Sequence, residues 1–237
     1  MFKNCSNLLQ TPTCANISTL NNSSKRCFAN MFEGCKKITA VMELNDFAFY
    51  TDTNAYEHIG EQMKEMYKGC ILLTTPYTKL DHGYTIGCYE SMYNGCTTLA
   101  TTSTFDNTKS ANAAENAVGT LKTRCCANMY TSTSVSIPVF PDDAPANIEY
   151  YSKNESYAYR KSYEHFYQMY YNCKSITSVT LNDINGGNQM FKETFIECTN
   201  ITTVNISFNI IDDYTAQNMF YHCTALTSIT LSILAIK

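Results

Sequence analysis

Cysteine is the residue type with the widest chemical capability in this 237-residue chain, and it occurs twelve times. Seven cysteines stand three residues after an aromatic side chain: Cys5, Cys35, Cys70, Cys96, Cys173, Cys198 and Cys223. Thiols at a regular spacing could form disulfides, bind zinc or act as nucleophiles. Zinc is disfavoured because the chain has no C-x-x-C or H-x-x-x-H spacing. We therefore predict small apolar thiols that are reduced and buried, and no metal site.

A disulfide remains an open question for three further cysteines, Cys14 and the adjacent Cys125 and Cys126. Two cysteines can be bridged only when their Cα atoms lie about 4.4 to 6.8 Å apart. We expect the seven regularly spaced thiols to lie farther apart than this, so no bridge is predicted among them. Cys27, Cys88 and Cys125 each precede an aromatic residue by five positions, which predicts partial burial.

Signatures of nucleophilic catalysis are weak. The chain has no phosphate-binding glycine loop, no G-x-S-x-G and no dinucleotide-binding fingerprint. A Cys/His nucleophile could be drawn from His165 with Cys173, or from His222 with Cys223. Both cysteines belong to the regular series, however, so packing is the preferred interpretation. The histidines occupy unrelated positions of the pattern: His58, His82, His165 and His222.

Two pairs of adjacent acids could bind a cation or act as paired carboxylates, namely Asp142 with Asp143 and Asp212 with Asp213. Such pairs are more often solvated turn residues, or residues that favour the N-terminal dipole of a helix. We predict no catalytic, cofactor-binding or metal-binding residue, and therefore no enzyme.

The segments that carry the cysteines repeat along the chain. Between 170 and 231 one pattern occurs three times at a period of 25 residues: an aromatic anchor, then apolar residues at positions +3, +6, +9 and +11. Less regular copies precede these three, which makes eight anchors: Phe2, Phe32, Tyr67, Tyr93, Tyr130, Tyr170, Phe195 and Phe220. A period of this length is typical of stacked supersecondary units that bury a shared core.

Each copy has two parts. Apolar residues at −4, −1, 0 and +3 relative to the anchor fall within one stripe of a helix, which predicts about two helical turns with one buried face. The following positions alternate between apolar and polar residues rich in Thr, Val and Ile, which predicts a short strand. We expect one solenoid over residues 1–237, with about eight strand-plus-short-helix units and a parallel sheet on one face.

The string Met219-Phe220-x-x-Cys223-x-x-Leu226-x-x-Ile229-x-Leu231 resembles the bacterial surface protein A-like (BspA-like) leucine-rich repeats, in the variant that opens with Met-Phe. The resemblance extends over most of the chain and implies a leucine-rich-repeat fold of the α/β class. It also implies a non-catalytic protein-recognition or adhesion module at a cell surface, whose ligand is a protein or a glycan.

Composition narrows the range of partners. The formal net charge is −4, only 16% of the residues are charged, and no basic cluster is present, which disfavours nucleic acid. No run approaches the roughly 18 apolar residues that a membrane span requires. The expected surface is therefore rich in hydrogen-bonding Asn, Thr, Ser and Tyr side chains.

Two surfaces are candidates for partner binding. Insertions near 45–60, 103–122 and 139–162 separate the copies, and the third contains Tyr150, Tyr151, Tyr157 and Tyr159. Tyrosine among small polar residues is typical of recognition surfaces, although these side chains could equally pack onto their own repeat. The other candidate is the outward face of the strands: Ser178, Thr180, Thr203, Asn205, Ser228 and Thr230.

The two ends suggest an alternative function. Met1 occupies a methionine position of the repeat, and the segment 231–236 is apolar, so neither end resembles a polar cap. We expect a fragment of a longer chain, or ends covered by neighbouring subunits or flanking domains. The alternative is therefore a structural component of a larger assembly, such as a virion appendage or a surface layer. The expected location is the cell surface or extracellular space, or the virion, although this chain contains no signal peptide.

Overall fold

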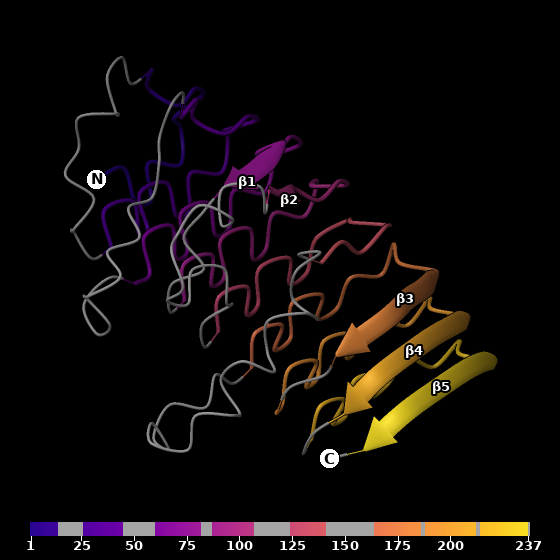
Figure 1. Ribbon diagram of the computed structural model, residues 1–237. Helices are drawn as coiled ribbons and strands as arrows, with labels where there is room; N and C mark the ends of the chain where they lie inside the picture. Colours follow the sequence, from indigo (N-terminus) through magenta and orange to yellow (C-terminus); the bar gives the residue numbers. More distant parts are fainter. Residues whose placement is uncertain are drawn as a thin grey trace, which may run out of the picture.

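A computed structural model describes residues 1–13, 26–44, 60–81, 87–106, 124–140, 164–185, 188–211 and 214–236. Successive copies of the repeat stack in sequence order, and the chain termini lie toward opposite ends of the stack (Figure 1). The described residues contain no helix long and apolar enough to cross a membrane.

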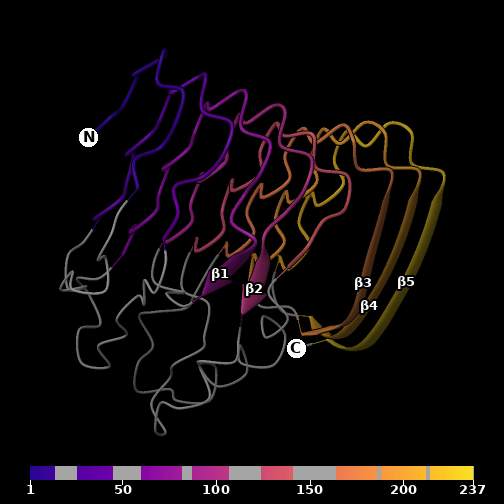
Figure 2. The same cartoon turned by 90° about the horizontal axis from the view of Figure 1, so that it is seen from above.

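Strands occupy one side of the stack. Three long strands, β3 (Ser178–Asn185), β4 (Thr203–Ile211) and β5 (Ser228–Ile236), form a parallel sheet in that order. Two short strands, β1 (Lys79–Asp81) and β2 (Thr104–Asp106), form a separate parallel pair. An isolated parallel bridge joins Ala40 to Thr75. The strand side is therefore regular only in the last three copies, as the arrows in Figure 2 illustrate.

The predicted solenoid of strand-plus-helix units is wrong, because the described residues contain no helix. The segments around each anchor are chains of overlapping β-turns instead. In the second copy, the N–H groups of Met31, Glu33 and Cys35 each donate to the carbonyl three residues earlier. The intervening N–H groups donate to the next copy, as when Phe32 donates to the Met66 carbonyl at 2.9 Å.

This alternation joins neighbouring copies through the main chain. The anchor N–H donates to the carbonyl at position −1 of the following copy in all seven successive pairs, from Phe2 to Met31 through Phe195 to Met219. A second column joins position +2 to position +1, from Asn4 to Glu33 through Glu197 to Tyr221. A helix satisfies its N–H groups internally and would leave none for such contacts. We call the whole arrangement the turn ladder.

The turn ladder depends on a left-handed backbone at every fourth residue. In the second copy these residues are Arg26, Asn30 and Gly34, with φ of 62°, 58° and 72°. The positions −6, −2 and +2 have positive φ in all seven later copies. The structural period is thus four residues, against 3.6 in a helix. Over two turns the two periods differ by less than one residue, so the same apolar positions are buried in either structure.

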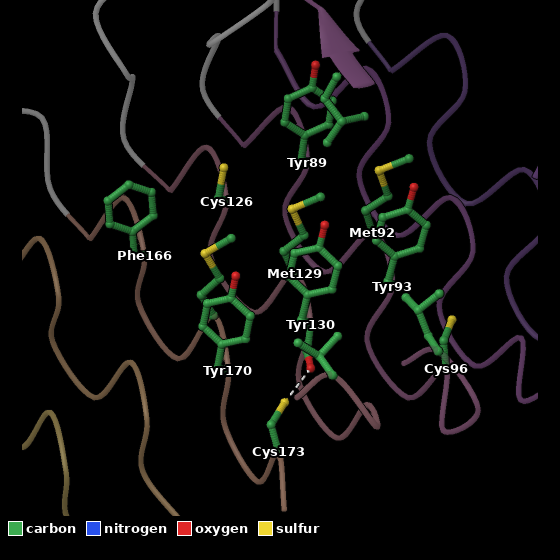
Figure 3. Close-up of a cluster of buried hydrophobic side chains, with 14 of the residues drawn as sticks. Tyr89, Met92, Tyr93, Cys96, Cys126, Met129, Tyr130, Phe166, Tyr170 and Cys173 are labelled. Atoms are coloured by element: carbon green, nitrogen blue, oxygen red, sulfur yellow. Dashed lines mark hydrogen bonds between the residues drawn. The ribbon is translucent and has the colours of Figure 1, made fainter. Parts of the chain in front are cut away.

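The core is a continuous stack of the eight anchors. All seven successive ring pairs are stacked, with centroids 5.4 to 6.0 Å apart. Methionine precedes most anchors on one side and cysteine follows most of them on the other, so that Met129, Tyr130 and Cys173 belong to parallel rows (Figure 3). This spacing is close to that of paired strands and much smaller than the 8 to 10 Å between packed helices. The turn ladder thus lets the turn side and the strand side of each copy stack on the next copy at nearly the same spacing.

Candidate recognition surfaces

The outward face of β3–β5 carries one polar row that crosses the three strands. Thr180 pairs with Asn205, and Asn205 pairs with Thr230, so the three residues lie side by side in register. All three are exposed. Their neighbours Val179 and Leu181 on β3 are buried, because successive side chains of a strand point to opposite faces. The predicted outward orientation of Thr180, Asn205 and Thr230 is therefore confirmed.

A second polar row lies at the start of the same strands. Thr177, Thr202 and Thr227 are exposed and equivalent in the three copies. The hydroxyl of Thr202 donates to the Thr177 carbonyl at 3.2 Å, and that of Thr227 donates to the Thr202 carbonyl at 3.2 Å. These hydroxyls already have partners within the protein. Among the described residues, the side chains of Thr180, Asn205 and Thr230 form no hydrogen bond.

The inward face of β5 differs from that of β4. In the register of the sheet, Ile229 is equivalent to Val204 and Leu231 to Ile206. Val204 and Ile206 are 3% and 4% exposed, whereas Ile229 and Leu231 are 61% and 55% exposed. Apolar side chains that form core in one copy are thus surface in the next.

The tyrosine-rich candidate cannot be placed. Tyr150, Tyr151, Tyr157 and Tyr159 lie outside the described residues, as do Asp142 and Asp143, Asp212 and Asp213, His58 and His82. The three predicted insertions are likewise almost wholly outside them. The structure therefore brings together only the strand residues of the predicted binding set.

The cysteines are packing residues wherever they are described. Cys125 and Cys126 are free and buried, and every later member of the regular series from Cys35 onward is also free and buried. Each buried thiol of that series donates to the anchor carbonyl of the preceding copy, as Cys198 does to Tyr170 at 3.0 Å. Burial raises the pKa of the Cys70 thiol to about 12, so it stays protonated. Cys14 lies outside the described residues.

Two cysteine predictions fail at the surface. Cys5 belongs to the regular series but is exposed, unlike the members from Cys35 onward. Cys27 is also exposed, whereas Cys88 and Cys125 at the equivalent position are buried. The expectation that equivalent cysteines lie beyond disulfide distance assumed the spacing of packed helices. It does not apply to copies whose anchor rings stack this closely.

Neither of the two hypothetical Cys/His nucleophile pairs is formed. His165 is buried, and burial lowers its pKa to about 4. Its Nδ1 atom has no hydrogen-bond partner among the described residues. His222 is exposed and its Nδ1 atom lies 2.6 Å from Glu197 Oε1, while the Cys223 thiol donates to the Phe195 carbonyl. The described residues also contain no group of three or more potential metal ligands.

A charged network on the turn ladder was not expected from the sequence. Arg124 lies 3.1 Å from Glu90 and 2.6 Å from Glu164, and its guanidinium carbon is 5.3 Å from the centre of the Tyr167 ring. Lys192 approaches the same ring at 5.7 Å. These residues come from four successive copies, so no local spacing could reveal them. Because the pairs are partly exposed, their contribution to stability is small.

Comparison with known proteins adds no assignment: the chain matches no protein-family model, no curated protein and no solved structure. The resemblance to BspA-like repeats therefore stays a prediction, and function has to be argued from the surfaces.

Proposed function

We propose that this protein is a non-catalytic recognition or adhesion module at a cell surface, and that it binds a protein or glycan ligand on the outward face of β3–β5. The observation that supports this most directly is the row of Thr180, Asn205 and Thr230, which are exposed and in register.

The row has the chemistry for hydrogen-bonded recognition. The two hydroxyls each donate and accept, and the Asn205 amide offers two donors and one acceptor oxygen. Paired strands hold these groups about 4.8 Å apart on a rigid surface. A flat polar surface without a large aromatic or Arg anchor gives modest affinity, and repeated weak contacts suit adhesion through many copies.

The test is a binding screen of the full chain against an array of cell-surface glycans and matrix proteins. Asn205→Arg places a long charged side chain at the centre of the row, so we expect it to abolish the signal on every ligand that the wild type binds. Ser175→Arg is the matched control, because Ser175 is exposed on the same copy as β3 but lies before the strand. It should bind as the wild type does.

A third variant separates the two candidate surfaces. Replacing Tyr150, Tyr151, Tyr157 and Tyr159 with Ser tests the tyrosine-rich segment directly. If this variant loses binding while Asn205→Arg retains it, the proposed face is wrong. The alternative function is a structural component of a larger assembly, such as a virion appendage or a surface layer.

A further inference from the structure

The anchors are of two kinds, which differ by a phenol hydroxyl. Four consecutive anchors are tyrosines, namely Tyr67, Tyr93, Tyr130 and Tyr170, and the others are phenylalanines. All four tyrosine rings are fully buried. Figure 3 shows three of them with their hydroxyls on the side away from Cys96 and Cys173. Burial raises the pKa of the Tyr130 hydroxyl, so it stays protonated. Buried hydroxyls of this kind need hydrogen-bond partners inside the protein.

Each of these hydroxyls accepts a main-chain N–H from the preceding copy. The donors are Met42 to Tyr67 at 2.8 Å, Tyr77 to Tyr93 at 3.1 Å, Ser103 to Tyr130 at 2.8 Å and Val139 to Tyr170 at 2.8 Å. Three donors stand ten residues after the anchor of their own copy, and Val139 stands nine after it. We call these four donors the phenol-bound residues. The hydroxyl therefore binds nearly the same point of each preceding copy.

Phenylalanine anchors occur where this N–H is absent or lies within a strand. Phe32 follows a copy whose +10 residue is Pro12, and proline has no N–H. Phe195 and Phe220 follow copies whose +10 residues, Thr180 and Asn205, lie inside β3 and β4. Paired strands use their main-chain groups for each other. In all seven pairs of successive copies, the type of the anchor thus follows the path of the chain in the preceding copy.

The phenol-bound residues turn toward the core. Met42 and Ser103 are fully buried, and Tyr77 and Val139 are partly buried against the core. The +10 residues of the later copies are exposed instead, as the row of Thr180, Asn205 and Thr230 shows. In the earlier region β1 and β2 begin only after the phenol-bound residue, whereas β3 and β4 begin before position +10. Strand pairing there starts beyond the point that the hydroxyl binds.

We propose that the hydroxyls of the four tyrosine anchors are positioning groups, each of which holds the phenol-bound residue of the preceding copy against the core. They thereby set which copies can present a polar +10 residue on the outward face. Loss of a hydroxyl would leave a buried N–H without a partner, which favours its movement to water. The link to recognition rests on the proposed function, whereas the positioning itself is tested without a ligand.

The experiment measures exposure at position 103, since Ser103 is fully buried and its N–H donates to Tyr130. Ser103→Cys replaces one oxygen atom with sulfur and supplies a thiol whose rate of alkylation by iodoacetamide reports access to water. Peptide mass spectrometry of the labelled full chain separates this position from the twelve natural cysteines. Cys96 is the internal reference, because it is a buried thiol of the same copy.

Tyr130→Phe in the Ser103→Cys background removes only the hydroxyl. We expect alkylation at position 103 to become about tenfold faster, as the loss of one buried hydrogen bond implies, and alkylation of Cys96 to stay unchanged. Tyr171→Phe is the matched control. Tyr171 is partly exposed, and its hydroxyl forms no hydrogen bond among the described residues, so this variant should change neither rate.

Thr180→Cys sets the upper limit of the measurement, because position 180 is exposed and the next anchor, Phe195, has no hydroxyl. It should react much faster than Ser103→Cys while Tyr130 is intact. Should Ser103→Cys fail to fold, hydrogen exchange of the Ser103 amide in Tyr130→Phe gives the same comparison. That amide should then exchange about tenfold faster, and the Cys96 amide at its original rate.

Three results would each overturn the proposal. Position 103 could react as fast as position 180 with Tyr130 intact, which would show that the residue is not held inward. Tyr130→Phe could leave the rate at position 103 unchanged. Equal acceleration at position 103 and at Cys96 would also overturn it, because the hydroxyl would then support the stack as a whole and position no particular residue.

Discussion

The copies between 26 and 140 and the copies between 164 and 236 share one turn ladder but differ on the strand side. In the later region three strands of eight and nine residues pair in register. In the earlier region the strands are three residues long or reduced to the bridge between Ala40 and Thr75. The main-chain columns and the ring stack nevertheless pass through both regions without interruption.

The difference shows what each side of a copy requires. A turn-ladder contact needs only a local pattern of apolar residues and a backbone that accepts positive φ at every fourth position. Strand pairing needs successive copies of equal length, because each strand has to begin in register with the strand of the preceding copy. Anchors are 25 residues apart in the later region and 26 to 40 apart in the earlier one. Insertions are therefore tolerated by the turn ladder, and the longest described strands occur in the copies of equal length.

The largest expected effect tests whether the turn ladder is equally strong in both regions. Tyr130 and Phe195 are fully buried and stacked on both faces, with ring centroids 5.4 to 5.5 Å from their neighbours. We expect Tyr130→Ala and Phe195→Ala each to cost roughly 4 kcal/mol in the free energy of unfolding, measured by urea denaturation.

Phe220→Ala is the internal control for that measurement. Phe220 is partly exposed and has one stacking partner, so its loss should cost clearly less than that of Phe195. A much smaller cost for Tyr130→Ala than for Phe195→Ala would show that the earlier region is the weaker one.

A smaller effect is expected at His165, where the two regions meet. Its carbonyl accepts the Cys126 N–H of the preceding copy at 3.1 Å, and burial lowers the imidazole pKa from 6.5 to about 4. The unfolded chain therefore binds the proton more readily than the folded chain does between these values. Stability is full above pH 6.5 and falls as pH decreases toward 4, by roughly 2 kcal/mol at pH 5.

Urea denaturation at pH 7 and pH 5 measures this loss. His165→Gln keeps an uncharged polar side chain of similar size, so the difference between the two pH values should shrink by the same roughly 2 kcal/mol. An unchanged pH dependence in the variant would assign the loss to other groups.

The smallest effects concern the positive-φ positions, which are filled differently in the two regions. Gly69 in the earlier region has φ of 73°, and Gln189 in the later region has φ of 53°. Gly69→Ala should cost about 1 kcal/mol, because a Cβ there meets only atoms of Gly34 at 3.9 Å and the cost is that of the backbone alone. Gln189→Gly should stabilise by about 0.5 kcal/mol, since relief of strain exceeds the added entropy of glycine.

Thermal unfolding checks both changes, with Gln189→Ala as the control that keeps the strain. A gain for Gln189→Ala equal to that for Gln189→Gly would show that the glutamine side chain, and not its backbone, is unfavourable.

Much of the packing could be predicted from the sequence, because burial follows residue type and spacing. Most anchors and most residues at −4, −1 and +3 are buried as predicted, and the alternation in β3 and β4 is as predicted, whereas Met1, Cys5 and Ala216 are exposed. The helices could not be excluded, since a period of 3.6 and a period of four place the same residues inward over nine positions. Glycine or asparagine at Asn4, Gly34, Gly69, Gly95 and Asn172 was the available signal for a left-handed backbone.

The candidate site likewise contains some features that the sequence predicts and others that it does not. The row of Thr180, Asn205 and Thr230 followed from alternation within strands, which is a local property. The exposure of Ile229 and the contacts of Arg124 depend on which copies are neighbours, and a pattern within one copy does not contain that information.

The hydrogen bonds of the anchor column all run in one direction, which has an electrical consequence. In the column of anchors, each peptide group points its carbonyl toward the first copy and its N–H toward the last. Each peptide carries a dipole of about 3.5 D, and aligned dipoles add. The peptide dipoles of the anchor column are therefore aligned along the axis of the stack. The net charge of −4 carries no information about this alignment.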